Sequence, residues 1–206
     1  TRYIGDWSSD VCSSDLAQTI GLGSQSIGAL STAQLVSLRW GSSTQLQMIT
    51  TAQINQLPGE AIDGGIKSYT STQVMALAST SISTLGTVAL QAFTSSQMVA
   101  LTSTQVGAFT PQAMGGLSSS QLVAIESSDM RALGADDIAA LTSSQVQSLT
   151  VGQLNGLGSS NWQALSSEKV GALTSGQVVG MTGQSIASLT SDQITAVSTA
   201  GMRSWS

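Results

Sequence analysis

The charged residues that could carry chemistry gather in one short stretch of the sequence, and they are Glu126, Asp129, Arg131, Asp136 and Asp137. Paired carboxylates act as acid and base in glycoside hydrolysis, and clusters of carboxylate oxygens bind calcium. A group of charges close together in a chain that otherwise carries little charge is also typical of a binding patch. These five residues therefore define the candidate site that the rest of the sequence must position.

Other catalytic constellations are missing from the sequence. The chain has no His, which removes His general bases, His-dependent triads and His-ligated metals. Its serines have no neighbouring base that would activate a nucleophile, since Lys67 and Lys169 are isolated. The Gly-Gly-x-Gly-x-Asp pattern of calcium-binding β-rolls is also absent. We therefore predict a chain that is not an enzyme and that needs no cofactor or metal.

The composition excludes further classes of partner. Only 8% of the 206 residues are charged, the formal net charge is −5, and the six basic residues are scattered, so nucleic-acid binding lacks its electrostatic footprint. The uninterrupted apolar runs are a few residues long, which is too short to insert into a membrane. Sugar-stacking tryptophans are a further option, but Trp162 and Trp205 occupy predicted core positions; Trp40 is less constrained.

The elements that must position these residues are octapeptide repeats. From residue 66 to residue 206, an apolar residue recurs every eight positions with a second one three residues later, through eighteen octads. In Thr142–Leu149, for example, position one is a hydroxyl residue, position four is Gln, positions five and eight are apolar, and position seven is small. Residues 17–57 carry the same pattern in another phase, and residues 58–65 break the register, as a kink or loop would.

Each octad predicts one short capped helix. The Ser/Thr-x-x-Gln spacing is that of the capping box, and Pro111 falls at a first helical position, where its missing N–H costs nothing. A straight helix would rotate the apolar pair by about 80° per octad, so the chain must bend once per repeat. We therefore predict an all-α solenoid of very short helices whose repeats contact mainly their chain neighbours, with a β-solenoid as the alternative.

The octads also offer a structural explanation for the acidic residues. Glu126 occupies a cap position, Asp129 and Asp137 occupy the Gln position, and carboxylates are favourable near helix N-termini in any case. This explanation outweighs the glycosidase and calcium hypotheses.

The first sixteen residues differ from everything that follows. The string from Asp6 to Leu16, DWSSDVCSSDL, resembles the translation of an indexed sequencing adapter, and Thr1–Arg2 fits the stretch before the index. This resemblance implies that residues 1–16, which include the single Cys12, are not native. Together with the missing initiator Met, it suggests a fragment of a longer, metagenomic sequence.

The Gln-centred octads resemble repeat tracts in large secreted or surface-attached bacterial proteins, as in Leu101–Ala108, LTSTQVGA. That resemblance implies an extracellular or cell-surface location and a spacer, stalk or adhesive role beside flanking domains of a longer chain. The alternative is a solenoid module that binds a peptide or a cell-surface glycan or protein, with the five charged residues as its patch.

Overall fold

The computed structural model describes residues 29–31, 33–34, 46–62 and 65–203. Within these ranges the chain forms short helices and no strand, which confirms the all-α solenoid and shows that the β-solenoid alternative is wrong. The predicted non-native segment 1–16 and Trp40 and Trp205 lie outside the described residues.

The elements are α5 (Thr51–Ile54), α6 (Gly59–Ile62), η1 (Ile66–Ser68), α7 (Ser71–Met75), α8 (Ser79–Ser83), α9 (Thr87–Gln91), α10 (Ser95–Val99), α11 (Ser103–Val106), α12 (Pro111–Gly116), α13 (Ser119–Ala124), η2 (Asp129–Ala132), α14 (Ala135–Ala139), α15 (Ser143–Ser148), α16 (Val151–Gly156), α17 (Ser159–Ala164), α18 (Ser167–Gly171), α19 (Ser175–Val179), α20 (Gly183–Ala187) and α21 (Ser191–Arg203).

Most octads begin their helix in the predicted way. In α15, the Thr142 hydroxyl accepts a hydrogen bond from the Gln145 backbone N–H, and the Gln145 side-chain oxygen accepts one from the Thr142 N–H. The same reciprocal pair opens α5, α7, α10, α11, α13, α16 and α19. Pro111 is the first residue of α12. Local capping therefore sets where these helices start, whereas α8, α9 and α17 begin without a side-chain cap bond.

Three elements depart from one α-helix per octad, and the first is the 3₁₀ helix η1 in octad 62–69. Octad 126–133 has Glu126 in the cap position and forms the 3₁₀ helix η2 without a side-chain cap bond. At the other end, α21 runs for 13 residues, past the expected bend. The helix continues through Ser198, the position-one residue of octad 198–205, where the repeat predicts a new cap.

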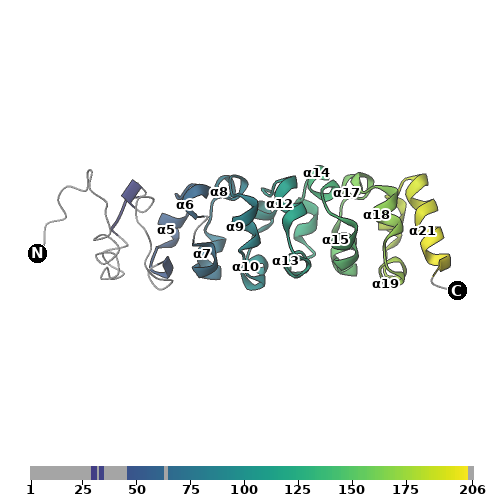
Figure 1. Ribbon diagram of the computed structural model, residues 1–206, viewed down its shortest axis with the longest axis horizontal. Helices are drawn as coiled ribbons and strands as arrows, with labels where there is room; N and C mark the ends of the chain where they lie inside the picture. The colour runs from purple at the N-terminus through teal and green to yellow at the C-terminus, as the bar shows by residue number, and fades with distance from the viewer. Residues whose placement is uncertain (1–28, 32, 35–45, 63–64, 204–206) are drawn as a thin grey trace, which may run out of the picture.

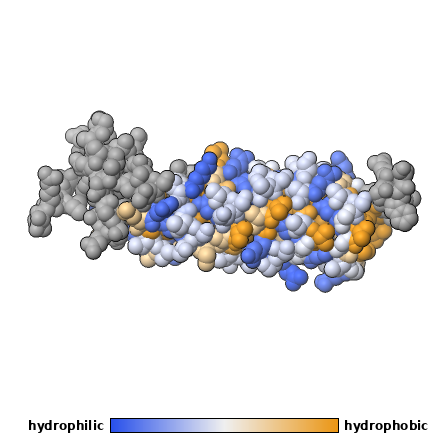
Figure 2. Space-filling model, turned by 90° about the horizontal axis from the view of Figure 1, so that it is seen from below, coloured by the Kyte–Doolittle hydropathy of each residue, from blue (hydrophilic) through white to orange (hydrophobic). Residues whose placement is uncertain are grey.

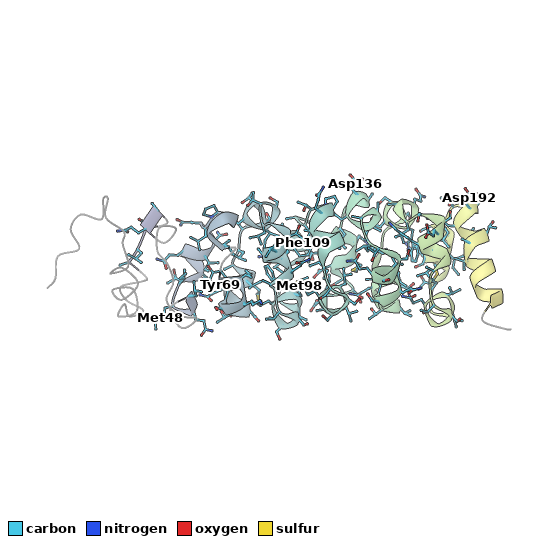
Figure 3. The ribbon with its side chains drawn as sticks, in the orientation of Figure 1. Met48, Tyr69, Met98, Phe109, Asp136 and Asp192 are labelled. Carbon is cyan, nitrogen blue, oxygen red and sulfur yellow. The ribbon has the colours of Figure 1, made fainter. Side chains whose placement is uncertain are left out.

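The apolar side chains at positions five and eight form one continuous core from Leu46 to Met181, whereas Ile186 and Ile194, at position five near the C-terminal end, are 48% and 46% exposed. Trp162 is fully buried in it, as predicted, and its indole Nε1 has no hydrogen-bond partner. Met98 and Phe109 lie inside the rod, whereas Asp136 points outward at its upper edge (Figure 3). Because helices of four to six residues are unstable alone, this shared core is what holds them.

The prediction that repeats contact mainly their chain neighbours is wrong. Helix α10, in octad 94–101, packs against α13, in octad 118–125, which comes three octads later; α14 packs against α17 in the same way. Figure 1 shows the result as an elongated rod, in which α7, α10, α13 and α15 follow one another along one edge. The bend after each helix winds the chain into a coil, so contacts form between successive turns.

The small residue at position seven is explained by this contact between turns. A Cβ added to Gly156 would collide with the Ser127 carbonyl oxygen and approach Met130 Cβ to 3.3 Å, and both residues belong to the octad three repeats earlier. A Cβ on Gly107, at position six, would lie 2.8 Å from the Ala132 carbonyl oxygen three octads later. Position six of one turn therefore faces position seven of the next.

The register break at residues 58–65 does not interrupt the core. Four of its residues form α6 rather than an open loop, and Ile62 is fully buried. Ile62 follows Ile54 by one octad, and Ile66 comes only four residues later, so the phase changes while the apolar column continues.

Candidate functional site

The most regular polar feature of the molecule is a row of buried amides at position four, which we call the glutamine ladder. Each of these side chains caps its own helix and also donates hydrogen bonds to backbone carbonyls of the preceding turn. The ladder consists of Gln73, Gln97, Gln105, Gln121, Gln145, Gln153, Gln177 and Gln193.

Gln145 illustrates the geometry. Its side-chain oxygen accepts from the Thr142 N–H at 2.7 Å, while Nε2 donates to the carbonyl oxygens of Met114 at 3.0 Å and Leu117 at 2.8 Å. These acceptors lie 31 and 28 residues earlier and occupy positions five and eight of their octad. Since helices also contact partners three octads away, each turn of the solenoid takes between three and four octads.

The ladder adapts to the register break. Gln73 donates to the carbonyls of Leu46 and Ile49, which lie 27 and 24 residues earlier, four fewer than in the regular array. Leu46 and Ile49 still occupy positions five and eight of their own octad. The ladder therefore joins the two phases of the repeat into one coil.

Sequence reasoning assigned Gln only to the capping box and missed this second role. A capping box accepts Glu as well as Gln, yet Glu never occurs at position four between residues 70 and 197. A carboxylate can satisfy the cap, but it cannot donate to a carbonyl. The absence of Glu was therefore the available signal that the Gln residues at this position also act as donors.

A second set of amides links the turns in the opposite direction. Gln91, Gln147 and Asn155, all at position six, donate to the carbonyls of Gly116, Ala172 and Gly180, which lie 25 residues later. The side-chain amides of the array therefore bond mainly to its own backbone.

Two of the five predicted site residues occupy the ladder position and are buried. The Asp129 carboxylate accepts a hydrogen bond from the Ser103 hydroxyl, and the residue is 6% exposed. Asp137 accepts from the Gly134 N–H at 2.9 Å. Burial raises the pKa of the Asp137 carboxyl, the Gly134 hydrogen bond opposes that shift, and the charge of Asp136 adds to it.

The remaining three are exposed: Glu126 lies before η2, Arg131 lies on η2 and Asp136 lies on α14. The structure therefore divides the predicted patch into three surface charges and two internal carboxylates. Among the described residues, no group of three acidic, Cys or His side chains could hold a metal ion.

One comparison with known proteins matches part of the chain to a known repeat. Residues 122–159 match a family model described as the ALTTAQ repeat. Read as amino acids, the letters ALTTAQ correspond to positions seven and eight of one octad followed by positions one to four of the next, as in Ala140–Gln145, ALTSSQ. No curated protein sequence matches the chain. In the part of the chain that the structure describes, no helix has the length and apolar character of a membrane span. The family match and the regular succession of short helices together identify a repeat-containing structural segment.

Proposed function

We propose that the chain is a non-enzymatic structural segment, a spacer, stalk or adhesive surface, of a larger secreted or surface protein. The observation that carries the proposal is the use of the regular polar side chains. Position-one hydroxyls and position-four amides are engaged in capping and in bonds between turns, as in Thr142 and Gln145. The polar side chains that recur through the octads thus support the rod.

The surface supports the same proposal. Figure 2 shows a face of mostly intermediate hydropathy with isolated strongly hydrophilic and hydrophobic residues. The most exposed large apolar side chains, Val179 at 86% and Val88 at 81%, lie far apart in the sequence. Such a surface suits a rod that separates other parts of a protein, because scattered apolar residues are normal and do not form a docking patch.

A spacer must hold its ends at a fixed separation. Single-molecule energy transfer between dyes on Ser71→Cys and Ser175→Cys, in a Cys12→Ser background, measures that separation, and both serines are exposed first residues of their helices. We expect one narrow distance distribution in the folded protein and a broad one in denaturant. A broad distribution in native buffer, like that of a flexible linker, would refute the spacer proposal.

An extracellular location is part of the proposal and rests on the low charge of the chain and on the resemblance of its octads to secreted repeat tracts. Antibodies raised against the folded array should label intact, unpermeabilised cells of the source. Labelling only after permeabilisation would place the protein inside the cell and contradict the proposal.

The alternative function is binding of a peptide or glycan, and one observation favours it. Glu126, Arg131 and Asp136 are exposed within two consecutive octads of an array that otherwise carries little charge. A glycan-array signal that the triple alanine variant abolishes, but that a Glu168→Ala, Asp192→Ala variant retains, would establish this alternative. Equal signals from both variants would exclude the patch as the binding site.

A further inference from the structure

The ladder position carries Asp in octads 126–133 and 134–141. Elsewhere between residues 70 and 197 the ladder is also interrupted, at Ser81, Ala89, Ala113, Asn161, Lys169 and Ser185. A ladder amide reaches the carbonyls 28 and 31 residues earlier in the chain. For position 129 these are the carbonyls of Leu101 and Met98, and for position 137 they are those of Phe109 and Val106. Among the described residues, none of these four carbonyls receives a side-chain hydrogen bond. These carbonyls therefore lack the side-chain donor that Gln121 and Gln145 supply on either side.

The side-chain length of Asp137 fits one of the missing bonds. Asn161 occupies the same octad position, and its Nδ2 donates to the Leu133 carbonyl, 28 residues earlier, at 2.9 Å. The equivalent acceptor for Asp137 is the Phe109 carbonyl. Toward a carbonyl at the equivalent place, an ionised carboxylate would be only a second acceptor, whereas a protonated carboxyl has an O–H to donate.

Few charges surround this position. Asp136 precedes Asp137 on α14, and Glu126, Asp129 and Arg131 lie in the preceding octad, where Ser103 holds Asp129. Helices α12 and α17, which pack against α14, carry no titratable residue. Lys169 donates to the Ala139 carbonyl at the other end of α14.

We propose that octads 126–141 form an acid-strengthened seam in the solenoid, in which uptake of a proton by Asp137 supplies the missing donor to the preceding turn. At neutral pH the ionised carboxylate leaves the preceding turn without this donor, and on mild acidification the protonated carboxyl supplies it. Burial of the carboxyl, which raises its pKa, favours the protonated form in the folded state and so supports the same direction.

Hydrogen exchange on the intact protein tests the seam. Protection factors, corrected for the intrinsic effect of pH, are compared between α14 and the pair α15 and α16 at neutral and mildly acidic pH. We expect protection of α14 to rise by roughly three- to tenfold on acidification, the factor that one additional net hydrogen bond supplies, with no rise in α15 or α16.

Three variants make the test specific. Asp137→Gln restores the ladder amide and should give high protection at both pH values, and Asp137→Asn should do so in part, following Asn161. Glu126→Gln removes an exposed acid from the same seam and should keep the pH response. A wild-type seam that does not respond to pH, or a response that persists in Asp137→Gln, would overturn the proposal.

Discussion

Replacing Gln145 by Ala tests whether the ladder holds successive turns together. The substitution removes the bond from the Thr142 N–H and the two bonds to the Met114 and Leu117 carbonyls, all between 2.7 and 3.0 Å. A neutral hydrogen bond contributes about 1 kcal/mol net, and a buried carbonyl left without a donor costs about 1–3 kcal/mol. The better helix propensity of Ala returns a few tenths of a kcal/mol.

The expected loss of unfolding free energy for Gln145→Ala is therefore about 2–4 kcal/mol. Urea titration followed by far-ultraviolet circular dichroism measures it. Gln163→Ala is the matched control, because Gln163 is exposed on α17 and its replacement should change stability by no more than about 0.5 kcal/mol.

A third variant separates the two roles of the ladder amide. Gln145→Glu keeps the acceptor for the Thr142 N–H but replaces the donor with an oxygen that faces the Met114 and Leu117 carbonyls. It should be at least as destabilising as Gln145→Ala at neutral pH and recover in part on acidification. If Gln145→Glu were as stable as the wild-type protein, bonds between turns would contribute nothing to stability. Capping alone would then explain why Gln recurs along the array.

Two further predictions concern backbone approach and burial. Gly156→Ala places a methyl group against Ser127 of the preceding turn and should lower the free energy of unfolding in urea by about 1–3 kcal/mol. Gly176→Ala, with open space around it, should instead raise that free energy by about 0.5–1 kcal/mol. Equal effects of the two substitutions would contradict the packing of position seven. Burial raises the pKa of Tyr69 from 10.0 to about 12. Because the folded state holds this proton more tightly than the unfolded state, stability should fall as pH rises from 10 to 12, and the fall should be smaller in Tyr69→Phe when unfolding is measured across that range.

Some features of this protein follow from short stretches of sequence. A capping box such as Thr142 with Gln145 joins residues three apart, so it can be recognised without knowing what packs against it. The eight-residue recurrence of apolar side chains likewise predicts the buried columns, including the burial of Trp162. The helix in each octad, the bend after it and the all-α solenoid were therefore predictable from the sequence.

Only the tertiary structure decided which octads meet. The octads are nearly equivalent, so the sequence gives no preference for pairing one with its neighbour or with a repeat three or four places away. That choice depends on the angle of each bend, summed over a turn of the coil, which places the Met114 and Leu117 carbonyls beside Gln145. The same coiling buries Asp129 and Asp137 between turns, so side chains that appeared as surface charges in the sequence became internal groups.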